Sequence, residues 1–298
     1  MTAERRYFGT DGVRGVAGET LTQSLVARLG VAFARWTGGA PVLLGRDTRA
    51  SGPALEAALA SGLRAGGASV RSGGVLPTPA VALLAGQGCG AVVSASHNPP
   101  EYNGVKFFGE GGWKLADEDE RALEDLLGTL DEPPEATFEE PADDGSYGSR
   151  YQELVAERFG SPLAGLRIAC DCANGAMSGV APSVLERLGA TVTALGDAPD
   201  GRNINVGCGA TDLALLGRVV SGGDFDLGVA FDGDGDRMLA VDGEGRALDG
   251  DEIIAVLALH LGFFFFVLSS MLIFCFLFVL WVICLFVFWT DVWFGLVM

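Results

Sequence analysis

Apolar and polar positions alternate in short segments from the N-terminus to about residue 261. Three short apolar runs predict strands, at residues 41–45, 90–94 and 104–108. Leucines at helical spacing predict a helix over residues 51–65, for which Ser51 would be the N-cap. An acidic start and an amphipathic pattern predict a second helix over residues 117–130. These elements form one unit of mixed helix and strand.

A linker and a second unit of the same kind follow. Residues 131–148 are rich in Pro, Asp and Glu and lack periodicity, which is typical of a linker. Apolar runs beyond it predict strands at residues 166–170, 191–195, 226–231, 237–241 and 246–248. Helical patterns predict helices at residues 151–159, 182–188 and 211–220. The alternation indicates an α/β architecture in at least two domains.

Polar residues follow several of the expected strands at the point where each strand ends. They are Arg46 and Asp47, the segment from Ser94 to Pro99, Asp171, and Asp232. In α/β sheets, ligands bind at the carboxyl edge of the strands. We therefore expect these residues to share one cleft.

Charge and composition exclude some classes of function. The chain has 298 residues, enough for about two domains, and a formal net charge of −18 that excludes a general nucleic-acid binder. Its two histidines disfavour a histidine-rich zinc site. Four of the six cysteines lie in apolar or Gly-rich contexts and none forms a Cys-x-x-Cys pair. We therefore expect reduced, buried thiols in a cytoplasmic protein without a signal peptide.

The C-terminal segment breaks this pattern. Residues 263–289 carry no charged side chain and are long enough to span a bilayer. The last basic residue is Arg246, whereas a membrane anchor usually has Lys or Arg at a flank. We favour a sequencing or frameshift artefact. A genuine membrane anchor and a buried pair of helices are the alternatives, and membrane contact is expected only if this segment is genuine.

A carboxylate loop is the strongest local signal. Asp232, Asp234 and Asp236 alternate with Gly233 and Gly235 directly after an apolar strand. The glycines let the backbone curl so that the three carboxylates can face one point, where they repel one another unless a cation lies among them. Oxygen ligands of this kind indicate Mg²⁺ or Ca²⁺. A solvated acidic turn is the alternative, which the position after a buried strand disfavours.

This loop does not fit an EF-hand. Arg237 stands where the EF-hand loop needs Gly, and Gly243 stands where it needs a bidentate Glu. Three anionic ligands leave room in an octahedron for a phosphate oxygen. Arg237 follows the last aspartate, so it is placed to contact the same phosphate.

A serine loop follows another expected strand. Ser96 precedes His97, but adjacent side chains point apart and no Gly-x-Ser-x-Gly motif surrounds the serine, which disfavours a Ser-His hydrolase. A polar turn closed by Asn98 and Pro99 is the alternative. Lys106 is a lone cation on an apolar strand, where it needs an anionic partner or a role in proton transfer.

Together these motifs resemble the α-D-phosphohexomutase superfamily. The resemblance covers about residues 5–261 and lies in four ordered pieces, residues 7–15, 45–52, 94–108 and 232–237. The amino-acid sequences of the first piece, of the serine loop and of residues 171–176 are similar to those of the bacterial phosphoglucosamine mutase branch. The resemblance implies repeated three-layer α/β/α domains. It places domain I at residues 1–145, domain II at 146–249, and an aborted start of domain III with the apolar tail at 250–298.

The resemblance also implies roles for individual residues. Ser96 would carry the phosphate, and one Mg²⁺ per chain would be held by that phosphate with Asp232, Asp234 and Asp236. Lys106 would act in proton transfer, and His97 would shape and polarise the serine loop. The residues implied for binding of substrate and phosphate are Arg14, Arg237 and Asn98.

The implied substrate is a hexosamine phosphate. Glucosamine 6-phosphate would become glucosamine 1-phosphate through a 1,6-bisphosphate intermediate, for synthesis of UDP-N-acetylglucosamine and peptidoglycan. Glucose or glucosamine 1,6-bisphosphate would act as activator. Phosphoryl transfer of this kind needs in-line positioning and charge neutralisation.

The sequence departs from the family after residue 261. The family is normally longer, with a sugar-reading Gly-Glu-x-Ser-Gly-His loop in its third domain and an Arg-x-Ser-Gly-Thr phosphate loop in its fourth, and neither string occurs. We therefore expect a truncated or frameshifted chain with little or no mutase activity. Competing hypotheses are a phosphoglucomutase or phosphomannomutase, a non-catalytic membrane-anchored protein, and a magnesium phosphatase, whose Asp-x-Asp-x-Thr/Val string is absent.

Overall fold

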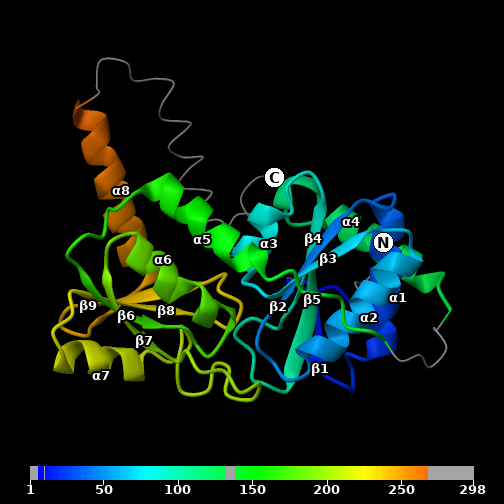
Figure 1. Ribbon diagram of the computed structural model, residues 1–298, viewed down its shortest axis with the longest axis horizontal. Helices are drawn as coiled ribbons and strands as arrows, with labels where there is room; N and C mark the ends of the chain where they lie inside the picture. Colours follow the sequence, from blue (N-terminus) through cyan, green and yellow to red (C-terminus); the bar gives the residue numbers. More distant parts are fainter. Residues whose placement is uncertain (1–5, 10, 132–137, 268–298) are drawn as a thin grey trace.

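The two units expected from the sequence form two separate five-stranded sheets (Figure 1). The structure, a computed structural model, describes residues 6–9, 11–131 and 138–267, with side chains to residue 259. The strands of the first sheet, in spatial order, are β1 (Val13–Val16), β5 (Tyr102–Phe108), β4 (Cys89–Val93), β2 (Val42–Arg46) and β3 (Val70–Val75). β2 pairs in parallel with β3 and β4, while β5 runs antiparallel to β4 and β1.

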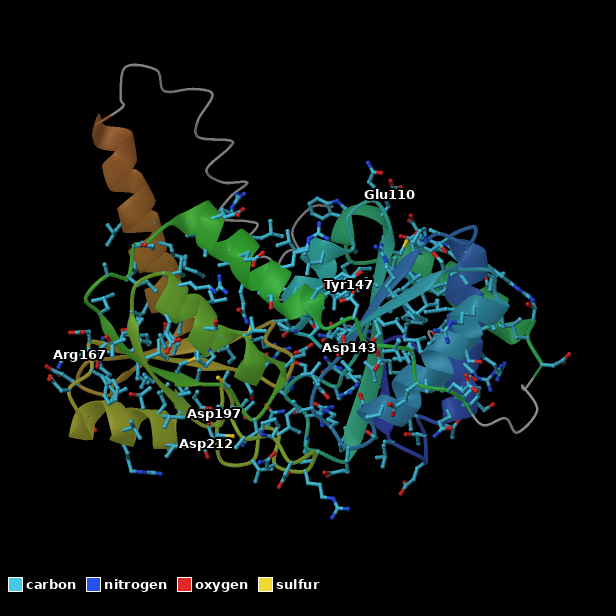
Figure 2. The ribbon with its side chains drawn as sticks, in the orientation of Figure 1. Glu110, Asp143, Tyr147, Arg167, Asp197 and Asp212 are labelled. Carbon is cyan, nitrogen blue, oxygen red and sulfur yellow. The ribbon has the colours of Figure 1, made fainter. Side chains whose placement is uncertain are left out.

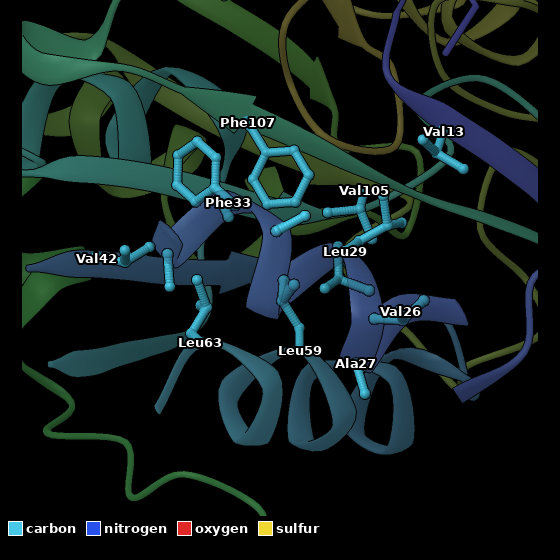
Figure 3. Close-up of a cluster of buried hydrophobic side chains, with 14 of the residues drawn as sticks. Val13, Val26, Ala27, Leu29, Phe33, Val42, Leu59, Leu63, Val105 and Phe107 are labelled. Atoms are coloured by element: carbon cyan, nitrogen blue, oxygen red, sulfur yellow. The ribbon is translucent and has the colours of Figure 1, made fainter. Parts of the chain in front are cut away.

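Helices cover both faces of the first sheet. They are α1 (Gln23–Trp36), α2 (Gly52–Ala65), α3 (Thr78–Leu84) and α4 (Asp117–Gly128). Because side chains alternate along a strand, Val42 and Leu44 pack into the cluster under α1, α2 and α4, while Leu43 packs on the α3 side. Phe33 and Phe107 stack at the centre of the larger cluster, with ring centroids 4.3 Å apart (Figure 3).

The second sheet repeats this plan. Its strands, in spatial order, are β10 (Ala247–Leu248), β9 (Met238–Asp242), β8 (Leu227–Phe231), β6 (Arg167–Asp171) and β7 (Thr191–Leu195). Its helices are α5 (Ser146–Phe159), α6 (Ala181–Arg187), α7 (Ala214–Gly222) and α8 (Gly250–Val267). One buried cluster lies on the α6 side of the sheet and a smaller one on the α7 side. The expected three-layer α/β/α architecture is therefore confirmed.

The described end of the linker and helix α5 lie at the boundary between the units. Helix α5 contacts α3 and β3 of the first unit and α6 of the second. Figure 2 shows Asp143 and Tyr147 between the two units. The backbone of Asp143 forms an isolated parallel β-bridge with Ser72, and Tyr147 is buried in the cluster on the α3 side of the first sheet. The end of the linker is thereby fastened to the first sheet.

Most expected elements are present, with ends that differ by a few residues. The expected linker ends too late, because α5 already begins at Ser146. The expected capping role of Ser51 is wrong. Ser51 precedes α2 with an αR backbone and no capping hydrogen bond, and its Oγ instead accepts from Asn103 Nδ2 at 2.9 Å. The helices and strands that the sequence pattern did not predict are β1, α1, β3, α3 and α8.

Two further expectations concern membrane contact and the cysteines. Among the described helices, none combines the length and the apolar character needed to cross a bilayer. The interpretations of the apolar C-terminal segment concern mainly residues 268–298, which lie outside the described residues. The described cysteines are buried and form no disulfide, as expected; they are Cys89, Cys170, Cys172 and Cys208.

Candidate active site

The serine loop begins where β4 ends. Ser96 is fully buried and has a positive φ of 53°, a left-handed conformation that is unfavourable for a residue with a Cβ. Its backbone N–H donates to Ser94 Oγ at 2.9 Å, and Ser94 Oγ donates to Asp47 Oδ2 at 2.6 Å. Asp47 follows β2, so the ends of two neighbouring parallel strands together hold the serine backbone.

The side chain of Arg49 holds the backbone of this loop through hydrogen bonds. Its side chain is fully buried and paired with Asp47, with Nε donating to Oδ2 at 2.9 Å. Its remaining N–H groups donate to the backbone carbonyls of Ser96 (3.0 Å), Asn98 (2.8 Å) and Pro99 in the serine loop, and to that of Tyr102 (2.9 Å) at the start of β5. A buried guanidinium is tolerated when it is paired and hydrogen-bonded in this way.

The carboxylate loop follows β8 and meets the serine loop. Ser96 Oγ donates to Asp232 Oδ2 at 2.5 Å, across the boundary between the two units. One carboxylate oxygen from each of Asp232, Asp234 and Asp236 can be chosen so that the three lie within 4.8 Å of one another. Gly233 permits this approach, because a Cβ at that position would lie 2.6 Å from the Ser96 carbonyl oxygen.

Lys106 extends from β5 into the carboxylate loop. Its Nζ lies 2.6 Å from Asp236 Oδ2, 3.1 Å from Asp234 Oδ2 and 2.9 Å from Asp11 Oδ2. Burial on its own would lower the pKa of Lys106, but the charges of Asp234, Asp236 and Asp11 outweigh it and raise the pKa. The lysine side chain is therefore an ammonium that neutralises part of the carboxylate cluster. The anionic partner expected for this lysine is present.

The three carboxylates differ in their tendency to ionise. Burial, together with the charges of Asp234 and Asp236, raises the pKa of Asp232. Burial and the charge of Asp234 likewise raise the pKa of Asp236. Burial opposes ionisation of Asp234 too, but the charge of Lys106 and a 2.7 Å hydrogen bond from Thr78 Oγ1 lower its pKa. This cluster carries more negative charge than its environment readily accepts.

The residues of this cluster fit a bound divalent cation. Among the described residues, Asp234 Oδ1 and Asp236 Oδ1 are buried and have no hydrogen-bond partner. A buried polar atom without a partner is costly. Carboxylate oxygens are the ligands that Mg²⁺ prefers, with other positions of its octahedron filled by water or phosphate. The donor set and the unpartnered oxygens therefore suit a hard cation.

His97 lies closer to the serine than the sequence suggested. The expectation that the adjacent side chains point apart is wrong, because His97 Nδ1 is 3.3 Å from Ser96 Oγ. The left-handed backbone at Ser96 changes the relative direction of the two side chains. Burial, and then the charges of Arg237 and Arg14, lower the pKa of His97, which favours the neutral imidazole.

Two of the three residues expected to bind phosphate, Arg14 and Arg237, lie beside the carboxylate cluster. Arg14, on β1, forms an ion pair with Asp11, which also contacts Lys106. Arg237 Nε is 3.9 Å from Asp236 Oδ1, and its backbone N–H donates to Asp232 Oδ1 at 3.1 Å. The described hydrogen bonds of Asn98 are made by its backbone. The assigned roles of these residues stay predictions.

Comparison with known proteins agrees with this geometry. The family model for domain I of phosphoglucomutase/phosphomannomutase, described as an α/β/α domain, matches residues 5–133, and the model for domain II matches residues 149–245. The chain belongs to the phosphoglucomutase/phosphomannomutase family. Both members of the central contact, Ser96 and Asp232, lie inside the matched segments.

Relatives within the family include bacterial phosphoglucosamine mutases. The chain is 48% identical over 271 residues to the phosphoglucosamine mutase of Deinococcus radiodurans, with 86% of this chain and 60% of the relative covered. It is 47% identical over 265 residues to that of Desulforudis audaxviator, covering 85% of this chain and 59% of the relative. The chain thus spans about 60% of the length of the curated relatives that it matches.

A solved structure supports the fold assignment. A phosphoglucomutase/phosphomannomutase family protein from Burkholderia thailandensis superposes with a TM-score of 0.69 at 29% identity, covering 85% of this chain and 58% of the other. The fold of the two phosphoglucomutase/phosphomannomutase domains is thereby shown.

Several residues of the site were not selected from the sequence. Asp11 and Arg49 lie inside recognised family motifs, and their positions could have drawn attention to them. Thr78 and Asn205 have no comparable local signal. Thr78 bonds Asp234 from 156 residues away, and Asn205 bonds Ser96 from 109 residues away.

Proposed function

We propose that this chain carries the phosphoserine and metal-binding part of a phosphoglucosamine mutase. The observation that carries the proposal is the 2.5 Å contact of Ser96 Oγ with Asp232 Oδ2, because it joins a nucleophile-bearing loop to a carboxylate cluster. The 48% identity to a phosphoglucosamine mutase supports the choice within the family. The proposed substrate is glucosamine 6-phosphate, with a hexose 1,6-bisphosphate as the source of the serine phosphate.

The proposed reaction is a phosphoryl transfer from Ser96 to the sugar. The 1-hydroxyl oxygen of glucosamine 6-phosphate bonds to the phosphorus while the bond from Ser96 Oγ to phosphorus breaks. The sugar hydroxyl loses its proton and the Ser96 oxygen gains one, so the proton count is conserved. The reverse transfer, from the 6-position of the 1,6-bisphosphate, restores the phosphoserine and leaves glucosamine 1-phosphate.

We assign the proton movement to Lys106, which extends from the strand next to β4 toward the carboxylate loop. Neutral His97 would polarise the serine oxygen from 3.3 Å. Arg14 and Arg237 would neutralise the phosphate charge, and Asn98 would complete the phosphate-binding loop. Fixed charges aimed at the transferring group stabilise a phosphoryl-transfer transition state.

We propose that Asp232, Asp234 and Asp236 hold one Mg²⁺ together with the phosphate on Ser96. The unpartnered buried oxygens of Asp234 and Asp236 support this assignment. When bound, the ion supplies charge neutralisation for the phosphoryl oxygens and makes the serine oxygen a better leaving group. We also propose that domain I ends near residue 145 and domain II near residue 249.

The test is uptake of phosphate. The full chain is incubated with Mg²⁺ and glucose 1,6-bisphosphate, and intact-mass and peptide mass spectrometry locate any added phosphoryl group. We expect one group on Ser96, none on Ser96→Ala, and normal uptake by Ser221→Ala, an exposed serine on α7. Uptake should fall when EDTA removes divalent cations. The absence of phosphate on the wild type, or equal uptake by Ser96→Ala, would contradict the proposal.

A phosphoglucomutase or phosphomannomutase is the second candidate. The matching family models carry those names, and so does the Burkholderia relative. Phosphate on Ser96 should be discharged by the preferred sugar phosphate. Loss of the phosphoserine to glucosamine 6-phosphate faster than to glucose 6-phosphate or mannose 6-phosphate supports the first candidate, and the opposite order supports the second.

A further inference from the structure

The carbonyl oxygen of Ser96 accepts hydrogen bonds from both units of the molecule. From the first unit, Arg49 Nη2 donates to it at 3.0 Å. From the second unit, Asn205 Nδ2 donates to it at 2.9 Å. The Asn98 carbonyl is shared in the same way, with Arg49 at 2.8 Å and Asn205 at 3.3 Å. The Ser96–His97 and Asn98–Pro99 peptide groups are thus each held from both units.

The backbone of Asn205 is held in a conformation that allows this contact. It belongs to the loop between β7 and α7, and its backbone has a positive φ of 59°. Its N–H donates to the Ala173 carbonyl at 2.9 Å. Asparagine adopts this left-handed conformation more readily than most residues. The turn therefore directs an amide with two N–H donors at two carbonyl oxygens of the other unit.

We propose that Asn205 is a positioning residue for the nucleophile, which makes the geometry of Ser96 depend on the approach of the second unit. The inference rests on the proposed phosphoserine function. Ser96 is held in an unfavourable left-handed backbone, and its hydroxyl direction follows from that backbone. Arg49 belongs to the same unit as the serine and supports the loop in every arrangement of the units. Asn205 belongs to the second unit, so it bonds the serine loop only when the second unit, with its carboxylate loop, is packed against the first.

Two substitutions of Asn205 distinguish the effect of its side-chain amide from the effect of its backbone conformation. Asn205→Gly keeps the left-handed conformation without a steric cost but removes both donors. Asn205→Ala removes the donors and also adds backbone strain. Asn203→Ala is the matched control, because the described hydrogen bonds of the Asn203 side chain, with the Asp200 N–H and the Ala198 carbonyl, lie within its own loop. The full chain is used in each case.

The first measurement is the rate of phosphate uptake on Ser96 from glucose 1,6-bisphosphate. We expect Asn205→Gly and Asn205→Ala to slow uptake by roughly 10- to 100-fold, as displacement by up to about 1 Å slows a positioned reaction. Asn203→Ala should remain within about 3-fold of wild type, since it leaves the two carbonyls bonded. A wild-type rate for Asn205→Gly would show that only the backbone conformation matters and would overturn the proposal. Equal slowing by Asn203→Ala would overturn it too.

The second measurement does not depend on phosphate transfer. Hydrogen exchange is followed by mass spectrometry in peptides that cover residues 94–103, which lie in the other unit from the substitution. Asn205→Gly should speed exchange there, while Asn203→Ala should not. Unchanged exchange in Asn205→Gly overturns the positioning role. The wild type could take up no phosphate while Asn205→Gly still exchanges faster than wild type over residues 94–103. In that case the proposed function is wrong, but the positioning of the serine loop by Asn205 is supported.

Discussion

The two units have the same sheet plan but make different contributions to the site. β4 and β8 occupy equivalent places, each parallel to one neighbour (β2 or β6) and antiparallel to the other (β5 or β9). The serine loop follows β4 and the carboxylate loop follows β8. The same position in the fold therefore supplies a nucleophile in one unit and metal-type ligands in the other.

A second pair of equivalent positions shows how the two units support their loops. Asp47 directly follows β2 and Asp171 is the last residue of β6, and each accepts a hydrogen bond from the backbone N–H two residues later. Asp47 is also paired with buried Arg49, whereas the described hydrogen bonds of Asp171 come from the N–H groups of Ala173 and Gly209. The loop that holds the nucleophile is thus fixed by a buried ion pair, and its counterpart by neutral donors.

Arg49→Met should have the largest effect on stability. It would leave the Asp47 carboxylate buried without its ion-pair partner, and would remove the donors to three serine-loop carbonyls and to the Tyr102 carbonyl. Breaking a buried pair in this way costs about 3–5 kcal/mol. Urea unfolding would measure the loss. Arg64→Met, at an exposed position in α2, should change stability by less than about 0.5 kcal/mol. A similar small change for both variants would contradict the difference drawn between the two loops.

Gly233→Ala should separate the two loops without removing any functional side chain. The added Cβ would lie 2.6 Å from the Ser96 carbonyl oxygen, so the carboxylate loop must move away. We expect phosphate uptake to fall about 100-fold, since the serine and the carboxylates would no longer meet. Gly222→Ala, where an added Cβ meets nothing within 4 Å, is the control. Uptake by Gly233→Ala at the control rate would show that the close approach is not required.

Asp171→Asn should have the smallest effect, and that effect should depend on pH. Burial raises the pKa of Asp171 above the ordinary value of 3.8. The folded state therefore holds its proton more tightly than the unfolded state, and the resulting stability is lost as the pH rises through the folded pKa. The advantage of wild type over Asp171→Asn should be larger at acid pH than at pH 7. Urea midpoints for both proteins across this range would check the sign, and a constant difference would contradict it.

Much of the fold follows from local patterns in the sequence. Apolar runs and helical spacings predicted the parallel strands that carry the site, because buried strands need continuous apolar residues. β1 and β3 were missed because Val-Arg-Gly-Val and Val-Arg-Ser-Gly-Gly-Val contain too few apolar residues to stand out. α3 is only seven residues long. The omission of α1 has no such reason, since Leu25, Leu29 and Phe33 have clear helical spacing.

The site was predictable as far as its residues lie in continuous motifs. The carboxylate loop and Ser96 stand in short segments whose chemistry can be read directly, and Lys106 is conspicuous on an apolar strand. Thr78 and Asn205 could not be selected, because their contacts exist only once the two units pack together. The proximity of His97 to Ser96 likewise depends on a backbone angle that no local pattern indicates.

The ion pairs of Lys106 have a consequence for the two units taken singly. The ammonium comes from one sheet, while two of its three carboxylate partners come from the other. Without the first unit, Asp234 and Asp236 would lose the lysine that balances their charge. Each sheet has a core of its own, but the charge balance at their boundary needs both.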